Sequence, residues 1–150
     1  MANTCAICGA TINVLQSQKL MDGNYICTKG CRAKGLKYYD YVHSDLDNVK
    51  DHIHQTEVGT KIWQDLMEPL KKTSDKNQKM QSFRPIYIAP SLGLIAVIEA
   101  RGGLFNTKTY ACVYRLENLQ LYRTERMPAR TSGSDKDKMC VHLGFVHTKG

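Results

Sequence analysis

The chain has 150 residues, a hydrophobic content of 42% and a formal net charge of +7. This composition is that of a globular chain and excludes disorder throughout, while the longest apolar run, Leu92 to Ile98, is far too short to span a bilayer. A basic excess of this size serves nucleic acid, an acidic protein surface or solubility, so charge alone does not choose between these roles.

Two close cysteine pairs stand at the start of the chain. Cys5 and Cys8 form a Cys-x-x-Cys pair that is followed by Gly9, and Cys27 and Cys31 form a second pair further on. Pairs at this separation can converge on one tetrahedral ion, because a short turn lets two thiolates reach the same metal without strain. Four thiolates also fill the coordination shell, which indicates a structural Zn²⁺ site and not a catalytic one.

The alternative for these cysteines is two disulfides or four unrelated thiols. The N-terminal residues Met1 to Cys5 contain neither a basic start nor an apolar stretch, so they do not resemble a secretory signal. We therefore expect a cytoplasmic protein, in which thiols stay reduced and paired cysteines more often hold metal.

The segment Lys19 to Cys27 carries the turn signal Asp22-Gly23 and predicts a short hairpin. Together with Cys5-x-x-Cys8-Gly9, this segment resembles the N-terminal zinc ribbon of a group of uncharacterised bacterial and phage proteins. The resemblance implies a treble-clef arrangement of knuckle, hairpin and short helix, with Gly35 ending the helix. The Cys27-x-x-x-Cys31 pair is one residue longer than the usual form. A similarity of layout also implies a pleckstrin-homology-like half-barrel in the rest of the chain.

Aromatic and helical patterns follow the cysteines. The aromatics between Tyr38 and Tyr41 either pack onto the small zinc module or stack on nucleic-acid bases, and we expect packing. Ser44 is the predicted N-cap of an amphipathic helix running to about Thr56, with a buried stripe of Leu46, Val49 and Ile53. We expect Gly59 to interrupt this helix. A second stripe comprises Ile62, Trp63, Leu66 and Leu70 and ends at Pro69, and His52 and His54 face solvent.

The pattern changes after a polar segment. Residues 71–81 lack an apolar face and are expected to form a linker or long loop. Short β-type runs follow, rich in Ile, Val, Tyr and Leu and separated by turn residues. The predicted strands are residues 85–89, 94–100, 109–116, 119–124 and 139–145, arranged as an antiparallel meander.

These patterns predict an α+β protein in three parts. The parts are a zinc ribbon at residues 1–40, a helical connector and polar linker at 41–81, and an antiparallel β domain at 82–150. The zinc module is too short to bury much core, so the metal must supply much of its folding free energy.

The common catalytic and phosphate-binding motifs are absent from the sequence. Cys140 and His142 lie on one face of a predicted strand, and with Cys112 they leave open a second metal or a Cys–His nucleophile. Lone cysteines in strands are usually small buried hydrophobes, so we do not expect an enzyme.

The leading hypothesis is a non-enzymatic zinc protein that binds another macromolecule, first of all a protein. A sheet edge suits strand capture and would also allow oligomers, and the phage resemblance implies an inhibitor of a host protein as a sharper version. The alternative is nucleic-acid binding, and no membrane role is expected. Candidate partner-binding residues are Arg32, Lys34, Lys37, Arg115, Arg123 and Arg126.

Overall fold

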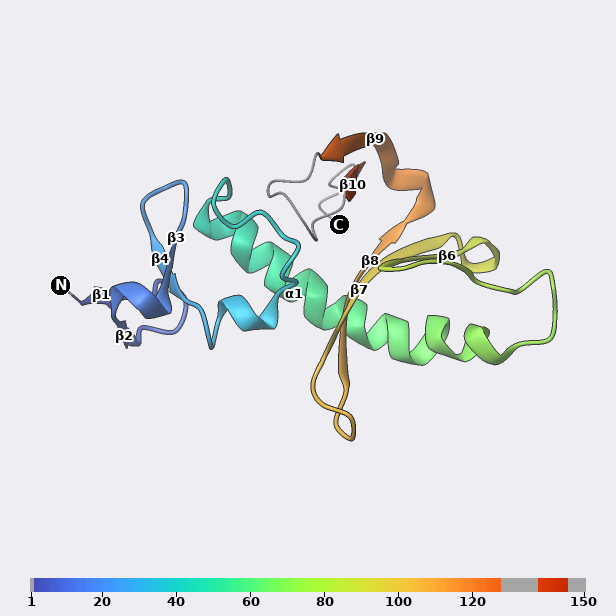
Figure 1. Ribbon diagram of the computed structural model, residues 1–150, viewed down its shortest axis with the longest axis horizontal. Helices are drawn as coiled ribbons and strands as arrows, with labels where there is room; N and C mark the ends of the chain where they lie inside the picture. The colour runs from blue at the N-terminus through green and yellow to red at the C-terminus, as the bar shows by residue number, and fades with distance from the viewer. Residues whose placement is uncertain (1, 128–137, 146–150) are drawn as a thin grey trace, which may run out of the picture. The chain divides into compact units, whose positions relative to one another are not determined.

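The computed structural model describes residues 2–127 and 138–145, with side chains described up to residue 120. The chain divides into two compact units, Met1–Val113 and Tyr114–Gly150. The first unit contains a long helix and small antiparallel sheets (Figure 1), so the α+β class is confirmed. The finer division into residues 1–40, 41–81 and 82–150 remains a prediction.

Two short hairpins make up the N-terminal part. Strand β1 (Asn3–Thr4) pairs with β2 (Thr11–Ile12), and β3 (Ser17–Lys19) pairs with β4 (Tyr25–Cys27). The turn predicted at Asp22 is present, because the Asn24 backbone N–H donates to the Asp22 carboxylate at 3.1 Å. Two 3-10 turns, η1 (Val14–Gln16) and η2 (Arg32–Lys34), complete this part, and Gly35 caps η2 as expected.

Helix α1 (Leu46–Ile62) connects the N-terminal part to a sheet (Figure 1). Its N-cap is Asp45, whose carboxylate accepts a hydrogen bond from the Asn48 N–H at 2.8 Å, so the prediction of Ser44 was wrong by one residue. The first stripe is confirmed, because Val49 is fully buried and both Leu46 and Ile53 pack against the cysteine-containing core.

Gly59 does not interrupt the helix, contrary to the sequence prediction. It lies inside α1 where the backbone of the neighbouring strand approaches closely, and a Cβ at this position would stand 2.5 Å from the carbonyl oxygen of Ala111. The glycine is therefore explained by helix–sheet packing, since no larger residue fits between the two backbones.

A π-helical turn, η3 (Trp63–Met67), follows α1, and the 3-10 turn η4 (Glu68–Lys72) continues past Pro69. The wider π turn shifts the buried face by one residue. Trp63 and Met67 are therefore fully buried, while Leu66 is 51% exposed, so the expected place of Leu66 in the stripe was wrong.

The described strands that follow the helical segment form two sheets and not one meander. A four-stranded sheet has the order β5-β6-β7-β8, and β9 pairs with β10 in a separate two-stranded sheet. The bounds are β5 Gln81–Phe83, β6 Ile86–Ala89, β7 Leu94–Arg101, β8 Lys108–Arg115, β9 Leu119–Met127 and β10 Lys138–Phe145. Strand β5 was not predicted, because it occupies the end of the polar segment and is exposed along its length.

The first unit has two hydrophobic clusters, one near each end of the long helix. The first cluster contains three of the paired cysteines together with Ile26, Tyr41 and Val49. The second cluster contains Trp63, Met67 and sheet residues such as Ala96. None of the helices in the described part of the chain combines the length and apolarity that crossing a bilayer requires.

Candidate metal centre

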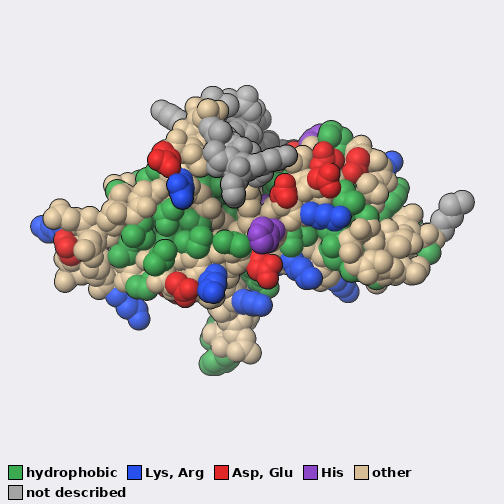
Figure 2. All heavy atoms as spheres, turned by 180° about the vertical axis from the view of Figure 1, so that it is seen from behind, with side chains coloured by type: hydrophobic (Ala, Val, Ile, Leu, Met, Phe, Trp, Pro, Cys, Tyr) green, Lys and Arg blue, Asp and Glu red, His purple; other side chains and the backbone are tan. Residues whose placement is uncertain are grey.

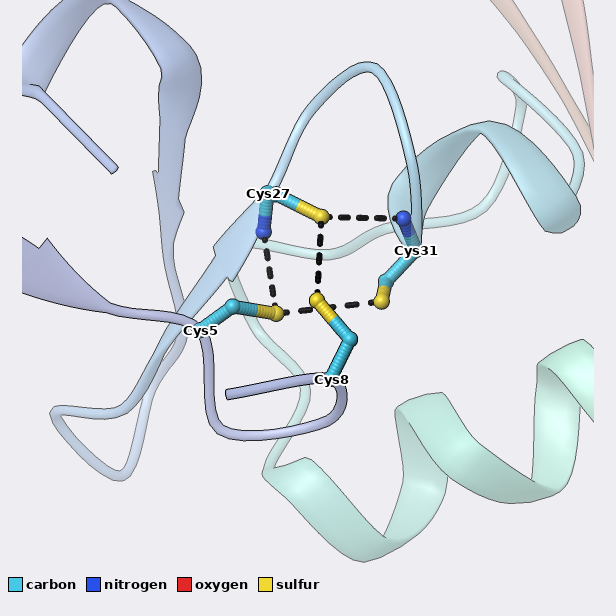
Figure 3. Close-up of side chains that lie close together, drawn as sticks. All are labelled: Cys5, Cys8, Cys27 and Cys31. Atoms are coloured by element: carbon cyan, nitrogen blue, oxygen red, sulfur yellow. Dashed lines mark hydrogen bonds between the residues drawn. The ribbon is translucent and has the colours of Figure 1, made fainter. Parts of the chain in front are cut away.

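Four cysteine sulfur atoms converge at one point in the N-terminal part (Figure 3). The Sγ atoms of Cys5, Cys8, Cys27 and Cys31 all lie within 4.8 Å of one another. Cys5 Sγ lies 3.7 Å from Cys31 Sγ, and Cys8 Sγ lies 3.8 Å from Cys27 Sγ. A tetrahedral ion with zinc–sulfur bonds of about 2.3 Å holds its sulfur atoms about 3.8 Å apart. The cluster therefore has the dimensions of a tetrahedral metal site.

The disulfide alternative does not fit this arrangement. A disulfide requires an S–S distance of about 2.05 Å, and the four cysteines are free. The sulfur atoms are close enough to share one ion and too far apart to be bonded to each other.

Short local elements place the four sulfurs. The Cys5–Cys8 turn is closed by the Gly9 N–H, which donates to the carbonyl oxygen of Cys5 at 2.9 Å. Gly9 has a φ of +74°, a left-handed conformation that glycine adopts without strain. Cys27 ends strand β4 and Cys31 caps η2, so the hairpin and the short helix each supply one ligand.

Backbone N–H groups point at the sulfur atoms. The Cys27 N–H donates to Cys5 Sγ at 3.4 Å, and the Cys31 N–H donates to Cys27 Sγ at 3.1 Å. Burial acts to raise the pKa of the Cys5 thiol, but backbone hydrogen bonds from Cys8, Cys27 and Ile7 outweigh it and lower this pKa to about 6. Burial and the neighbouring sulfur atoms raise the pKa of Cys31. Such a cluster favours a bound cation, which relieves the repulsion between closely spaced thiolates.

The exposure of the four cysteines matches a ligand role. Cys5 and Cys31 are 1% and 2% exposed, and Cys8 lies at the surface. Cys5, Cys27 and Cys31 therefore belong to the first hydrophobic cluster, while Cys8 is exposed.

The structure describes the side chains of four of the six predicted basic residues. Arg32 and Lys37 line the same cavity near η2, with the Arg32 guanidinium 5.1 Å from the centre of the Tyr41 ring. Lys34 is exposed, and Arg115 forms an exposed ion pair of 3.4 Å with Glu117. Arg123 and Arg126 lie on strand β9, and their side chains fall outside the described part of the structure.

His52 is buried, contrary to the sequence prediction that it faces solvent. It is 5% exposed, its Nε2 accepts a hydrogen bond from the Leu36 N–H at 3.0 Å, and its ring stacks on Tyr39. Burial lowers its pKa to about 4, so the imidazole is neutral. His54 is exposed, as predicted.

Cys112 belongs to the interior of the first unit. Its sulfur lies 3.1 Å from Thr56 Oγ1 and 3.8 Å from His52 Nδ1, and the side chain is 1% exposed. Neither the cavity beside η2 nor the cavity beside the sheet includes Cys112 in its lining. Cys140 and His142 lie on β10, opposite Glu125 and Arg123 in register, and their side chains fall outside the description.

Several residues that the sequence analysis passed over converge on a second feature, a cavity beside the sheet. Lys71 comes from the segment that was predicted to be a linker or long loop, Arg84 directly precedes the first predicted strand, and Glu99 comes from the interior of strand β7. No periodic pattern in the sequence indicated these residues, because only the packing of the helical segment on the sheet brings them together.

Comparisons with known proteins give no relative for this chain. No protein-family model matches it, and neither a curated protein nor a solved structure does. The resemblance to bacterial and phage zinc-ribbon proteins therefore rests on the cysteine and hairpin motifs alone.

Proposed function

We propose that the four cysteines bind one Zn²⁺ ion that holds the N-terminal part together. The observation that carries this proposal is the spacing of the sulfur atoms, 3.7 Å and 3.8 Å across the two pairs, together with their all-thiol chemistry. Four thiolates leave no coordination position for substrate or water, so the ion has a structural role. The order of knuckle, hairpin and short helix supports the treble-clef assignment. The pleckstrin-homology-like half-barrel is proposed from layout alone.

The chain acts, in this proposal, as a cytoplasmic binding protein and not as an enzyme. Its partner is another protein, which docks on the connection between β7 and β8. At the tip of this hairpin Leu104 is 95% exposed and Phe105 is 93% exposed, and Figure 2 shows the apolar tip projecting at the bottom of the view. Adjacent exposed apolar side chains mark a candidate site for protein–protein interaction. An inhibitor of a host protein is the specific form that the family resemblance suggests.

Nucleic-acid binding is the second candidate, because Arg32 and Lys37 line one cavity. The aromatics between Tyr38 and Tyr41 were expected to pack and not to stack on bases, and two of them pack. Tyr41 is 2% exposed and Tyr39 stacks on His52, so neither ring is free to stack on a base. Binding that weakens steeply with salt, and that Arg32→Ala with Lys37→Ala abolishes, would favour this candidate.

Metal analysis tests the zinc proposal. Protein purified under reducing conditions should contain one zinc per chain, and Cys5→Ser should lose the metal and the folded N-terminal part. Cys112→Ser is the matched control and should retain a full equivalent of zinc. Less than half an equivalent in the wild type, or retention by the Cys5 variant, would contradict the proposal.

Paired pull-downs test the protein partner. The wild type and a Leu104→Ser, Phe105→Ser variant serve as baits, and a partner that docks on the hairpin should be retained by the wild type alone. Leu15→Ser, which alters another exposed leucine at 93% exposure, is the control and should retain the same partner. Reconstitution from purified components must reproduce the difference. Equal retention by all three baits would exclude the hairpin as the interface.

A further inference from the structure

A cavity of about 460 Å³ lies beside the sheet, and none of the four clustered cysteines lines it. Its charged lining comes from three separate segments, with Lys37 after η2, Lys71 on η4 and Arg84 before β6. Tyr38 and Ile98 add an aromatic and an aliphatic wall. This volume falls within the range of about 300–1,000 Å³ that is usual for small-molecule sites.

Burial acts to raise the pKa of Glu99, but Arg101 and, less strongly, the charge of Lys37 lower it overall. Even so, none of the three cations lies within ion-pairing distance of a carboxylate among the described side chains. None of the ion pairs between those side chains includes Lys37, Lys71 or Arg84. The Lys71 ammonium lies 4.9 Å from the centre of the Trp63 ring and 5.1 Å from that of Tyr87, and Lys37 lies 5.1 Å from that of Tyr38. Aromatic faces hold these ammonium groups in place without neutralising them.

Glu99 is the one carboxylate among the described residues that line this cavity, and it is already engaged. Its Oε1 accepts from Arg101 Nε at 3.0 Å and its Oε2 accepts from Arg101 Nη2 at 2.8 Å. The Lys37 backbone N–H donates to Oε2 as well, at 2.9 Å. This bidentate pairing neutralises Glu99 within the wall, so the three cations retain their excess positive charge.

A second cavity of about 280 Å³ shares Lys37 and Glu99 with the first. Arg32 lines it, and the Arg32 Nε is a buried donor with no hydrogen-bond partner among the described groups. An unsatisfied guanidinium donor is costly unless an acceptor reaches it. The two cavities together therefore present uncompensated donors and positive charge around Lys37.

We propose that the cavity of about 460 Å³ binds a small organic phosphate that carries a flat ring and has the size of a nucleoside monophosphate. Lys37, Lys71 and Arg84 hold the phosphate, because they bring positive charge to this cavity from three separate segments of the chain. The ring of Tyr38, a residue that is 55% exposed, lies at the rim, where it can stack on the flat part of the ligand. The site uses neither the zinc ligands nor the hairpin tip, so it goes beyond the proposed function.

Calorimetric titration of the zinc-loaded full chain tests this proposal, with adenosine monophosphate as the probe. Inorganic phosphate and adenosine are titrated separately, because they carry the anionic and the ring part alone. Saturable binding should be tightest for the monophosphate, at least tenfold weaker for inorganic phosphate and undetectable for adenosine. The fluorescence of Trp63, the single tryptophan, provides a second readout, since a ligand that draws Lys71 towards its phosphate alters the surroundings of the ring.

Charge-removing variants locate the site. Lys71→Met and Arg84→Met keep most of the aliphatic stem and should each weaken binding of the monophosphate at least tenfold. Lys72→Met and Lys50→Met remove exposed charges that do not line the cavity and should leave the affinity within twofold. Zinc content and circular dichroism must match the wild type in all four variants.

Three outcomes would overturn the proposal. The first is an absence of saturable binding by the monophosphate in a folded, zinc-loaded chain, and the second is equal loss of affinity in the cavity and control variants. The third is binding of a single-stranded oligonucleotide that is at least a hundredfold tighter and unaffected by Lys71→Met and Arg84→Met. That result would assign the basic charge to nucleic acid outside this cavity.

Discussion

The His52 side chain on α1 contacts both the N-terminal part and the sheet. Its Nε2 accepts from the backbone that follows η2, its ring stacks on Tyr39 at 3.9 Å between centroids, and its Nδ1 faces Cys112 on strand β8. Because the Leu36 N–H donates to Nε2, a neutral ring carries its proton on Nδ1. The helix, the zinc part and the sheet therefore meet at a histidine that must remain uncharged.

Acid should destabilise the fold through His52. Burial lowers its pKa from 6.5 to about 4, so between these values the unfolded chain binds a proton that the folded chain does not. The free energy of unfolding should therefore fall as the pH drops from about 6.5 to 4, by on the order of 3 kcal/mol in total. Urea unfolding at a series of pH values, with zinc in excess, measures this loss.

Substitutions of two histidines separate this effect from acid release of the metal. His52→Gln keeps an acceptor for the Leu36 N–H and should flatten the pH dependence over that window. His54→Gln, at an exposed position two residues away, should leave the wild-type slope unchanged. Identical slopes in all three proteins would show that His52 does not titrate as its burial indicates.

Gly59→Ala should destabilise the protein, although alanine is ordinarily the better helix former by about 1 kcal/mol. The new Cβ would stand 2.5 Å from the Ala111 carbonyl oxygen and 2.8 Å from the Val113 nitrogen, which are backbone atoms that cannot rotate away. We expect a net loss of about 2 kcal/mol in urea unfolding, within the range for overpacked sites. Val58→Ala, at the neighbouring exposed position, should change stability little, and a stabilising effect of Gly59→Ala would refute the close approach.

At the scale of elements, the π turn decides which side chains of the helical segment reach the sheet. The Glu68 N–H bonds to the Trp63 carbonyl, five residues back, so Met67 and not Leu66 lies beneath the second cluster. Met67→Ala should therefore cost about 2–5 kcal/mol, the range for large-to-small changes in a core. Leu66→Ala should cost less than about 1 kcal/mol. Denaturant unfolding measures the stability loss of each variant. A larger loss for Leu66→Ala than for Met67→Ala would mean that Leu66 is the buried side chain, as a regular helical stripe predicts.

Elements specified by neighbouring residues could be predicted from the sequence. The cysteine spacing predicted the convergence of Cys5, Cys8, Cys27 and Cys31, and Asp22-Gly23 predicted the turn of the hairpin. The apolar spacing of Leu46, Val49 and Ile53 likewise predicted the buried face of the helix. In each case the controlling contacts lie within one turn, one hairpin or one helix face.

Features that depend on distant contacts were missed. Gly59 looked like a helix breaker, because its reason lies in Ala111 on another element. His52 looked like a surface residue, because its partner Leu36 precedes the helix and Cys112 follows it by 60 positions. The cavity cations Lys71 and Arg84 carried no local signal, since only the packing of η4 against the sheet brings them together.

At the scale of the whole molecule, the metal site and the helix share one core. The first cluster contains Cys5, Cys27 and Cys31 together with Val49 of α1, while the second cluster surrounds Trp63 near the other end of the helical segment. In the proposed function, this small module depends on its zinc ion for folding, because it buries little apolar area. Loss of the ion should therefore also unfold the first half of α1. The second cluster should stay folded, because it has its own apolar contacts.

Removal of zinc should unfold the chain unevenly. After chelation under reducing conditions, amide hydrogen exchange should become fast in β1 to β4 and in the first turns of α1, because their shared core loses its central ion. Protection should persist in β6 and β7, and the emission of Trp63 should remain that of a buried indole, because this side chain is fully buried in the second cluster. Readdition of zinc should restore protection. Addition of cadmium instead of zinc tests whether any soft ion with tetrahedral coordination has the same effect. A red shift of Trp63 emission that accompanies metal loss would mean that the two clusters unfold as one cooperative unit. Unchanged exchange in β1 to β4 would mean that the N-terminal part folds without an ion.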